Sequence, residues 1–357
     1  MAGEENNEVV DVAGGTSRYS EKIEDDAKSF GYKAANLLNL REVVKEFNEL
    51  LATNQDSQLG DNIIKVQVPA FEPVNGDVIK QHLDTHAPEW VNLFQEFADT
   101  YKAQSNLDTL SEASIECLKK LQECIINCFN QHELEPGLFN KFLEKNKIQP
   151  EQLLMIRSTG VHEDKADMAN PGGNESLPCK ANIREISQAL GRVAASYVGP
   201  KSLAQRLIAA DQHITDVPVM PGLIQQMIGE GMDVSQTADS QNKVPVSGVI
   251  YSKDGASRLQ VAHGHGEYVV NSKGRVDNFY ISTQGVVYSE IAAKDFRLQP
   301  KLDEDSQKIS LERQENPAEL KYQPSIASDV SQSFILCKFY FLHSNKSYLK
   351  SPQSISN

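Results

Sequence analysis

The sequence lacks the features that would place it in a membrane, in the secretory pathway or on nucleic acid. No run of about 18 apolar residues occurs, so no segment is predicted to span a bilayer. The N-terminus, MAGEENNEVVDVAGG, has neither the basic nor the apolar region of a secretory signal, and the cytosol is the expected compartment. The net charge of -14 disfavours a nucleic-acid partner, because basic patches bind phosphate backbones.

Cysteine is scarce, and the five residues present favour reduced thiols over a disulfide framework. Cys117, Cys124 and Cys128 are spaced so that they share one face of a predicted helix with leucines and isoleucines. Core packing is the preferred interpretation of this cluster. A metal site is the alternative, but no His or Cys pair with zinc spacing accompanies the three thiols.

The common nucleotide-binding and hydrolase motifs are also missing. The chain has no Gly-x-x-x-x-Gly-Lys-Ser/Thr P-loop and no Gly-x-Gly-x-x-Gly run after a strand. The protein-kinase motifs His-Arg-Asp and Asp-Phe-Gly and the Gly-x-Ser-x-Gly elbow of serine hydrolases do not occur.

The first part of the chain is predicted to be rich in helix. Residues 1–17 read as a disordered acidic leader. After a turn at Gly31, apolar residues at helical spacing predict a helix, and IIKVQVPAFEPV predicts a short strand that ends in a turn. Residues 76–149 are predicted to be amphipathic helices, broken near Pro88, Asn106 and Pro136.

The second part of the chain adds two helices and several strands. LLMIRSTG predicts a buried strand that runs into a polar loop, and residues 183–197 and 202–210 are predicted helices separated by Gly199 and Pro200. Five short runs then predict an antiparallel sheet: GLIQQMI, PVSGVIYS, RLQVAHG, GEYVV and DNFYIS. The expected fold class is therefore α+β with two lobes.

Several cationic and glycine-rich features could bind phosphate. Lys33 follows Gly31 in the turn, and Arg157 closes an apolar strand, where its guanidinium could hold phosphate oxygens with two hydrogen bonds. An arginine at the end of a strand is more often an ion-pair partner than a phosphate ligand. The prediction of phosphate binding therefore rests on the occurrence of these features together and in this order. A small-residue loop that could offer backbone N–H groups to a phosphate contains Gly172, Gly173, Asn174 and Ser176.

Eight short motifs follow one another along the chain: GYKAANL, VPAFEPV, IRSTGVHED, NPGGNES, SYVGPKSLAQRL, IQQMI, VSGVIYSKD and GHGEYVV. In this order they resemble motifs of the nucleotide-binding domain of the pyruvate phosphate dikinase and phosphoenolpyruvate synthase family. The first resembles the family's Gly-Gly-Lys-x-Ala-x-Leu opening, the third its Arg-Ser-Ser-x-x-x-Glu-Asp signature and the fourth its Gly-Gln-x-Glu-Thr loop. The match covers residues 31–281.

The resemblance implies an ATP-binding phosphotransferase. It implies a bilobal ATP-grasp-like fold and transfer of a phosphoryl group from ATP to a histidine on a separate domain or chain. Lys33 and Arg157 would neutralise the phosphates during transfer, with Arg206 assisting as a second phosphate-facing arginine. Mg²⁺ is expected to arrive with ATP.

The resemblance also implies roles for three further parts of the chain. Gln225 would lie near the adenine or ribose, the loop at 172–176 over the phosphates, and Glu267 would organise the second lobe. Pyruvate, phosphate with pyruvate, antibiotics and glucans are all final acceptors in the family, and the choice between them lies in domains outside the matched region.

The resemblance and the element pattern together divide the chain into a leader, two lobes and a tail. The first lobe would span 18–240 and contain a helical insertion at about 76–149. A partial second lobe would span 241–330, followed by an atypical tail at 331–357. This tail contains no Asp or Glu, and the family's Asp-x-Glu-Trp and Gln-x-Arg-Pro motifs, which hold Mg²⁺ and phosphate, do not occur.

Two hypotheses follow from these departures. The chain is either a phosphotransferase domain or a catalytically impaired nucleotide-binding or interaction protein, and a truncated or frameshifted product is expected.

Tyr32 replaces a family glycine, so the first turn is expected to differ. His265 replaces a family leucine and forms a His-x-His pair with His263, which in a strand would project both rings to one face. A substituted family position is preferred over a metal site there.

Overall fold

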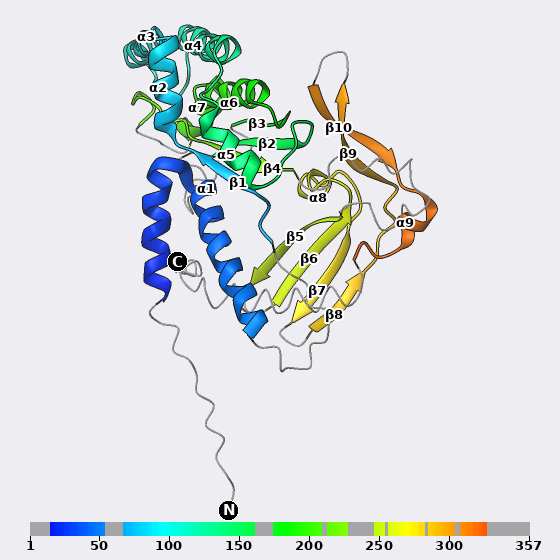
Figure 1. The fold of residues 1–357 in the computed structure, drawn as a ribbon. Helices are drawn as coiled ribbons and strands as arrows, with labels where there is room; N and C mark the ends of the chain where they lie inside the picture. Colours follow the sequence, from blue (N-terminus) through cyan, green and yellow to red (C-terminus); the bar gives the residue numbers. More distant parts are fainter. Residues whose placement is uncertain are drawn as a thin grey trace, which may run out of the picture.

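The computed structural model describes residues 15–53, 67–160, 174–208, 213–227, 246–253, 256–282, 285–303 and 308–326. These residues form helices and antiparallel sheets, which confirms the α+β class (Figure 1). None of the described helices has the length and apolar character needed to cross a membrane. Helix α1 (Gly15–Thr53) begins within the last residues assigned to the leader, and residues 1–14 lie outside the described part.

The first sheet contains four antiparallel strands in the order β1-β4-β2-β3. They are β1 (Phe71–Val74), β4 (Gly222–Gln226), β2 (Leu153–Ser158) and β3 (Ser176–Lys180). Burial alternates along β2, so Leu154 and Ile156 face the core and Arg157 faces the opposite side. Because β1 is an edge strand, it accommodates Pro73, at which the sequence predicted the strand to end.

The predicted helical region at 76–149 forms four helices, and one of them, α4, packs on α6, which in turn packs on β2, β3 and β4 of this sheet (Figure 1). The four helices are α2 (Gly76–His86), α3 (Trp90–Ala103), α4 (Glu112–Gln131) and α5 (Gly137–Lys145). Side-chain oxygens of Asn75, Ser111 and Asn182 accept backbone N–H groups at the starts of α2, α4 and α6 (Ile183–Tyr197). Helix α7 (Pro200–Ile208) begins at the proline that was predicted to lie between helices, where its missing N–H costs nothing.

The cysteines of α4 lie in the helical core. Cys117 and Cys128 are buried in the main hydrophobic cluster, and Cys124 packs at its margin. Burial raises the pKa of the Cys128 thiol to about 11, which keeps this side chain neutral at physiological pH. The structure therefore confirms core packing as the role of this cluster.

The second sheet is an antiparallel meander of four strands in chain order. They are β5 (Val246–Lys253), β6 (Ala256–His263), β7 (Asp277–Ser282) and β8 (Gly285–Glu290). A hairpin, β9 (Phe296–Asp303) and β10 (Lys308–Glu315), and helix α9 (Ala318–Tyr322) follow. The prediction of one sheet for the five runs is wrong in one respect, because GLIQQMI forms β4 of the first sheet.

The predicted strand in GEYVV is also wrong, because these residues form the short helix α8 (Glu267–Val270). Gly264 ends β6 with a φ of 93°, and the chain turns there instead of continuing as a strand. Tyr268 and Val269 are then buried against Leu298 of β9. Burial on this neighbouring hairpin outweighs the strand propensity of the two valines.

Candidate functional site

Helix α1 consists of two helical segments that meet at Gly31. Gly31 has φ 75° and ψ 162°, and a Cβ there would lie 1.4 Å from the carbonyl oxygen of Thr159. Only glycine can occupy this position. The predicted turn is therefore the break between the two segments, and Lys33 lies at the start of the second.

Tyr32, which was expected to alter the turn, is accommodated without a left-handed backbone, since Gly31 carries the positive φ. The Tyr32 ring is buried with Ile23 and Ala27 of the first segment, and its hydroxyl donates to Glu24 Oε2 at 2.5 Å. The side chain therefore packs the two segments of α1 against each other.

Three predicted site residues come together on the face of the first sheet that α6 does not cover. Arg157 Nη1 donates to Gln225 Oε1 across β2 and β4 at 3.3 Å. Ser176 of β3 is the register partner of Arg157, so its side chain lies on the same face. The polar face is half-buried at Arg157 and Gln225 and exposed at Ser176.

The second segment of α1 places Lys33 beside this face. Ala34, the next residue, packs in a small cluster with Phe71 of β1 and Leu223 of β4. The Ala34 N–H donates to Thr159 Oγ1 at 2.9 Å, and Thr159 directly follows β2. The start of this segment therefore lies at the end of the strand that carries Arg157.

The remaining predicted residues lie elsewhere or outside the described residues. Gly172 and Gly173 belong to the part of the chain that is not described. Arg206 Nη2 donates to the His213 carbonyl at 3.1 Å, on a helix that packs on α4 and α6, over the opposite face of the sheet. Glu267 opens α8, where its Oε1 accepts from Asn271, and α8 packs on β5, β6 and β9.

The His-x-His pair does not project both rings to one face, because Gly264 ends β6 between them. His263 is buried, and neither of its ring nitrogens has a hydrogen-bond partner among the described residues. Burial, with Lys294 nearby, lowers its pKa to about 4. His265 instead accepts the Glu267 N–H on Nδ1 at 3.3 Å.

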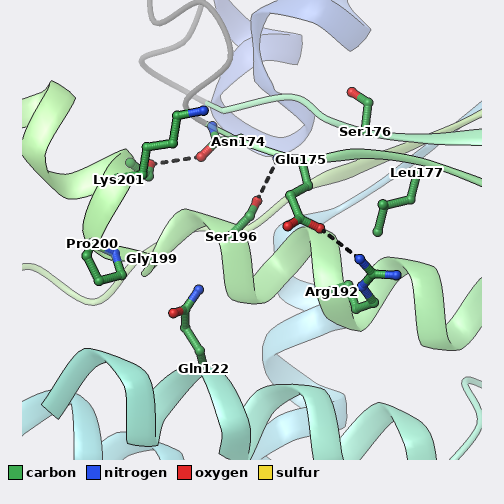
Figure 2. Close-up of a pocket in the computed structure, with 11 residues that line it drawn as sticks. Gln122, Asn174, Glu175, Ser176, Leu177, Arg192, Ser196, Gly199, Pro200 and Lys201 are labelled. Carbon is green, nitrogen blue, oxygen red and sulfur yellow. Dashed lines mark hydrogen bonds and ion pairs between the residues drawn. The ribbon is translucent and has the colours of Figure 1, made fainter. Parts of the chain in front are cut away.

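A cavity of about 420 Å³ opens at the β3 edge of the first sheet, where the predicted phosphate loop enters the strand (Figure 2). Ser202 Oγ donates to Asn174 Oδ1 at 2.8 Å, and the Glu175 N–H donates to Ser196 Oγ at 3.1 Å. Arg192 pairs with Glu175 at 3.5 Å. Of the residues on the polar face, Ser176 alone lines this cavity, so the cavity adjoins that face without including Arg157.

Metal ligands are not grouped in the described part of the chain. No three His, Cys, Asp or Glu side chains there are placed to hold an ion. The described residues therefore do not form the acidic site that Mg²⁺ would need, and we assign no step to it.

A family profile described as the AMP/ATP-binding domain of pyruvate phosphate dikinase matches residues 27–334. The chain belongs to this family. The match includes both four-stranded sheets, and it extends past residue 281, where the matching motifs end, to the first residues of the predicted tail at 331–357. Comparison with curated proteins found no match.

Within this pyruvate phosphate dikinase domain, Thr159 and Tyr197 are two residues that motif reasoning missed. Thr159 lies in IRSTGVHED, but the motif drew attention to its arginine. Tyr197 ends α6 and lies in SYVGPKSLAQRL, but that motif drew attention to Arg206. Their hydroxyl groups are buried near the polar face and carry hydrogen bonds between elements.

Proposed function

We propose that the chain binds ATP with its phosphates at the polar face formed by Arg157, Gln225 and Ser176, next to Lys33. The burial and the hydrogen bonding of the Arg157 guanidinium support this proposal most directly. Its guanidinium is half-buried and bonded to the neutral Gln225, and among the described residues no carboxylate forms an ion pair with it. A partly desolvated guanidinium without a carboxylate is suited to a phosphate.

The proposal divides the chain as the resemblance implies. Residues 18–240 would form the first lobe and 241–330 the second, with ATP between them as in ATP-grasp folds. Gln225 would contact the base or ribose, and Glu267 would approach from the second lobe. The loop at 172–176 would cover the phosphates, because its last residue, Ser176, is the register partner of Arg157.

We further propose that this domain transfers a phosphoryl group from ATP to a histidine on a separate domain or chain. Lys33 and Arg157 would hold the phosphates and offset the charge that moves during transfer. The competing proposal is a nucleotide-binding or interaction protein without transfer. It is favoured by the lack of three grouped metal ligands among the described residues.

Isothermal titration with ATP tests the binding proposal. We expect Arg157→Ala and Lys33→Ala to weaken ATP binding by about tenfold or more, since a hydrogen bond to a charged group contributes about 1.5–3 kcal/mol. The control is Arg184→Ala, which removes an exposed arginine at the start of α6. Equal affinities for all three variants and the unchanged chain, or no ATP binding at all, would contradict the proposal.

Turnover separates the two proposals. ATP consumption that depends on an added metal and is abolished by Arg157→Ala would support transfer. Binding of ATP without consumption, measured on the same samples by chromatography of the nucleotides, would support the nucleotide-binding protein.

A further inference from the structure

We infer that Thr159 and Tyr197 are positioning residues of the proposed ATP site. This inference rests on the proposed function, because it concerns how Lys33, Arg157 and Gln225 are held relative to one another. Thr159 lies two residues after Arg157, at the end of β2, and is completely buried. Tyr197 is the last residue of α6 and is 7% exposed.

The Thr159 hydroxyl joins the two segments of α1. Its Oγ1 accepts the N–H of Ala34 at 2.9 Å and donates to the carbonyl of Phe30 at 2.8 Å. These groups lie at the start of the second segment and at the end of the first, where a helix leaves its own N–H and carbonyl groups without partners. One side chain therefore connects both ends of the break at Gly31 and sets where Lys33 lies relative to β2.

The Tyr197 hydroxyl joins β2 to β4. It accepts the N–H of Thr159 at 2.7 Å and donates to the carbonyl of Pro221 at 2.9 Å. Ser158 and Gly222 are the last register pair of these strands, so Thr159 and Pro221 come immediately after the point where direct pairing ends. The phenol bridges this gap and thereby holds together the ends of the strands that carry Arg157 and Gln225.

The two side chains form one connected set, since the Tyr197 hydroxyl accepts the backbone N–H of Thr159. The bonds to the Ala34 N–H, the Thr159 N–H and the Pro221 carbonyl are buried, so loss of either hydroxyl leaves a buried backbone group without its partner. The elements carrying Lys33, Arg157 and Gln225 all meet at this point. A loss here would change the spacing of the three residues, even though neither Thr159 nor Tyr197 is assigned a contact with ATP.

Matched variants test the inference. Thr159→Val keeps the side-chain shape and removes the hydroxyl, whereas Thr159→Ser keeps the hydroxyl. We expect Thr159→Val, which loses both hydrogen bonds of the hydroxyl, to bind ATP about tenfold more weakly or worse, and Thr159→Ser to restore affinity to within about threefold of the unchanged chain. Titration calorimetry measures both.

Hydrogen exchange gives a second measurement that does not depend on ATP. We expect the Ala34 amide to exchange at least about tenfold faster in Thr159→Val than in Thr159→Ser, because it loses its acceptor. If the unchanged chain does not bind ATP, the proposed function fails, and this measurement still decides whether Thr159 holds the second segment of α1. Equal exchange in the two variants would overturn the inference.

Tyr197→Phe is the second variant and serves if Thr159→Val does not fold. It should weaken ATP binding about tenfold while leaving exchange at Ala34 unchanged. Its control is Tyr268→Phe, which removes the hydroxyl bond of another buried tyrosine, to the Arg275 carbonyl in the second-sheet region. Equal ATP affinities of Tyr197→Phe and Tyr268→Phe would show that loss of the Tyr197 hydroxyl affects ATP binding no more than loss of any buried tyrosine hydroxyl. That result would overturn the positioning role of Tyr197.

Discussion

Individual charged side chains occupy contrasting environments in this protein. Lys294 and Asp277 form an ion pair at 2.7 Å in which both side chains are fully buried. Arg297 is 1% exposed and bonds to the neutral oxygens of Asn316 and Glu315. Arg157, in contrast, is half-buried on an open face. Nearly complete burial against protein oxygens suits a structural role, whereas partial burial without a carboxylate suits ligand binding.

His263 gives a pH dependence of stability. Its pKa falls from the ordinary value of 6.5 to about 4, because of burial first and Lys294 and Arg297 second, while Asp277 acts in the opposite direction. Between these values the unfolded chain binds a proton that the folded protein does not. The free energy of unfolding should therefore fall as the pH drops from 6.5 towards 4.

We expect His263→Asn to flatten this part of the pH profile by about 2–3 kcal/mol, measured by urea unfolding at several pH values. His213→Asn is the control, because the His213 side chain is 64% exposed. A profile for His263→Asn that superimposes on that of the unchanged chain would contradict this assignment.

At the scale of elements, the break in α1 depends on a single glycine. Gly31→Ala would place a methyl group 1.4 Å from the Thr159 carbonyl oxygen in a backbone region unfavourable for alanine. We expect a loss of about 3 kcal/mol or more in the free energy of unfolding, from backbone strain and overpacking together. Thermal and urea unfolding measure it.

Gly137→Ala is the matched control for this prediction. Gly137 begins α5, and the nearest atom to an added Cβ is 3.9 Å away. The alanine should be neutral or slightly stabilising, because alanine favours helix. A loss of stability equal to that of Gly31→Ala would contradict the role given to the break.

Helices and strands whose apolar residues recur at regular spacing were predictable from the sequence. Elements whose conformation depends on packing against a neighbouring element were not. The helices between Gly76 and Lys145 and the strand LLMIRS follow their patterns. Helix α8 does not, because burial on β9 decides its conformation. The β9–β10 hairpin was missed, since charged and polar residues interrupt its apolar pattern.

The same limit applies to the candidate site. Arg157, Ser176 and Gln225 each belong to a motif that resembles the family, and the structure places them on adjacent strands with a shared face. Thr159 and Tyr197 act through a backbone carbonyl and an N–H group of distant segments. A pattern of residue types cannot predict hydrogen bonds to backbone groups of segments far away in the sequence.

At the scale of the whole molecule, Asp277 connects three segments of the second-sheet region. Its carboxylate accepts Lys294 Nζ, the Ala292 N–H and, at 2.7 Å, the Ser325 N–H. The backbone N–H of Lys294 in turn donates to the carbonyl of Lys321, in α9. The pair therefore holds the sheet, the segment before β9 and the last described residues together.

We expect Lys294→Met to cost about 3–5 kcal/mol of unfolding free energy, because it leaves the Asp277 carboxylate buried without its cation. Lys80→Met is the control, since the Lys80–Asp84 pair is partly exposed and its loss should cost less than about 1 kcal/mol. Urea unfolding distinguishes the two. Equal losses would show that burial does not raise the cost of breaking the pair.

The hydrogen bond from the Ser325 N–H to Asp277 also affects the order in which parts of the chain can fold during synthesis. All strands of the first sheet are present once Gln226 has left the ribosome, so that sheet can pair while translation continues. Asp277 emerges 48 residues before the backbone N–H that completes its bonding. Until then the carboxylate lacks one of its three partners, and the region around the second sheet reaches its final packing only near the end of the described chain.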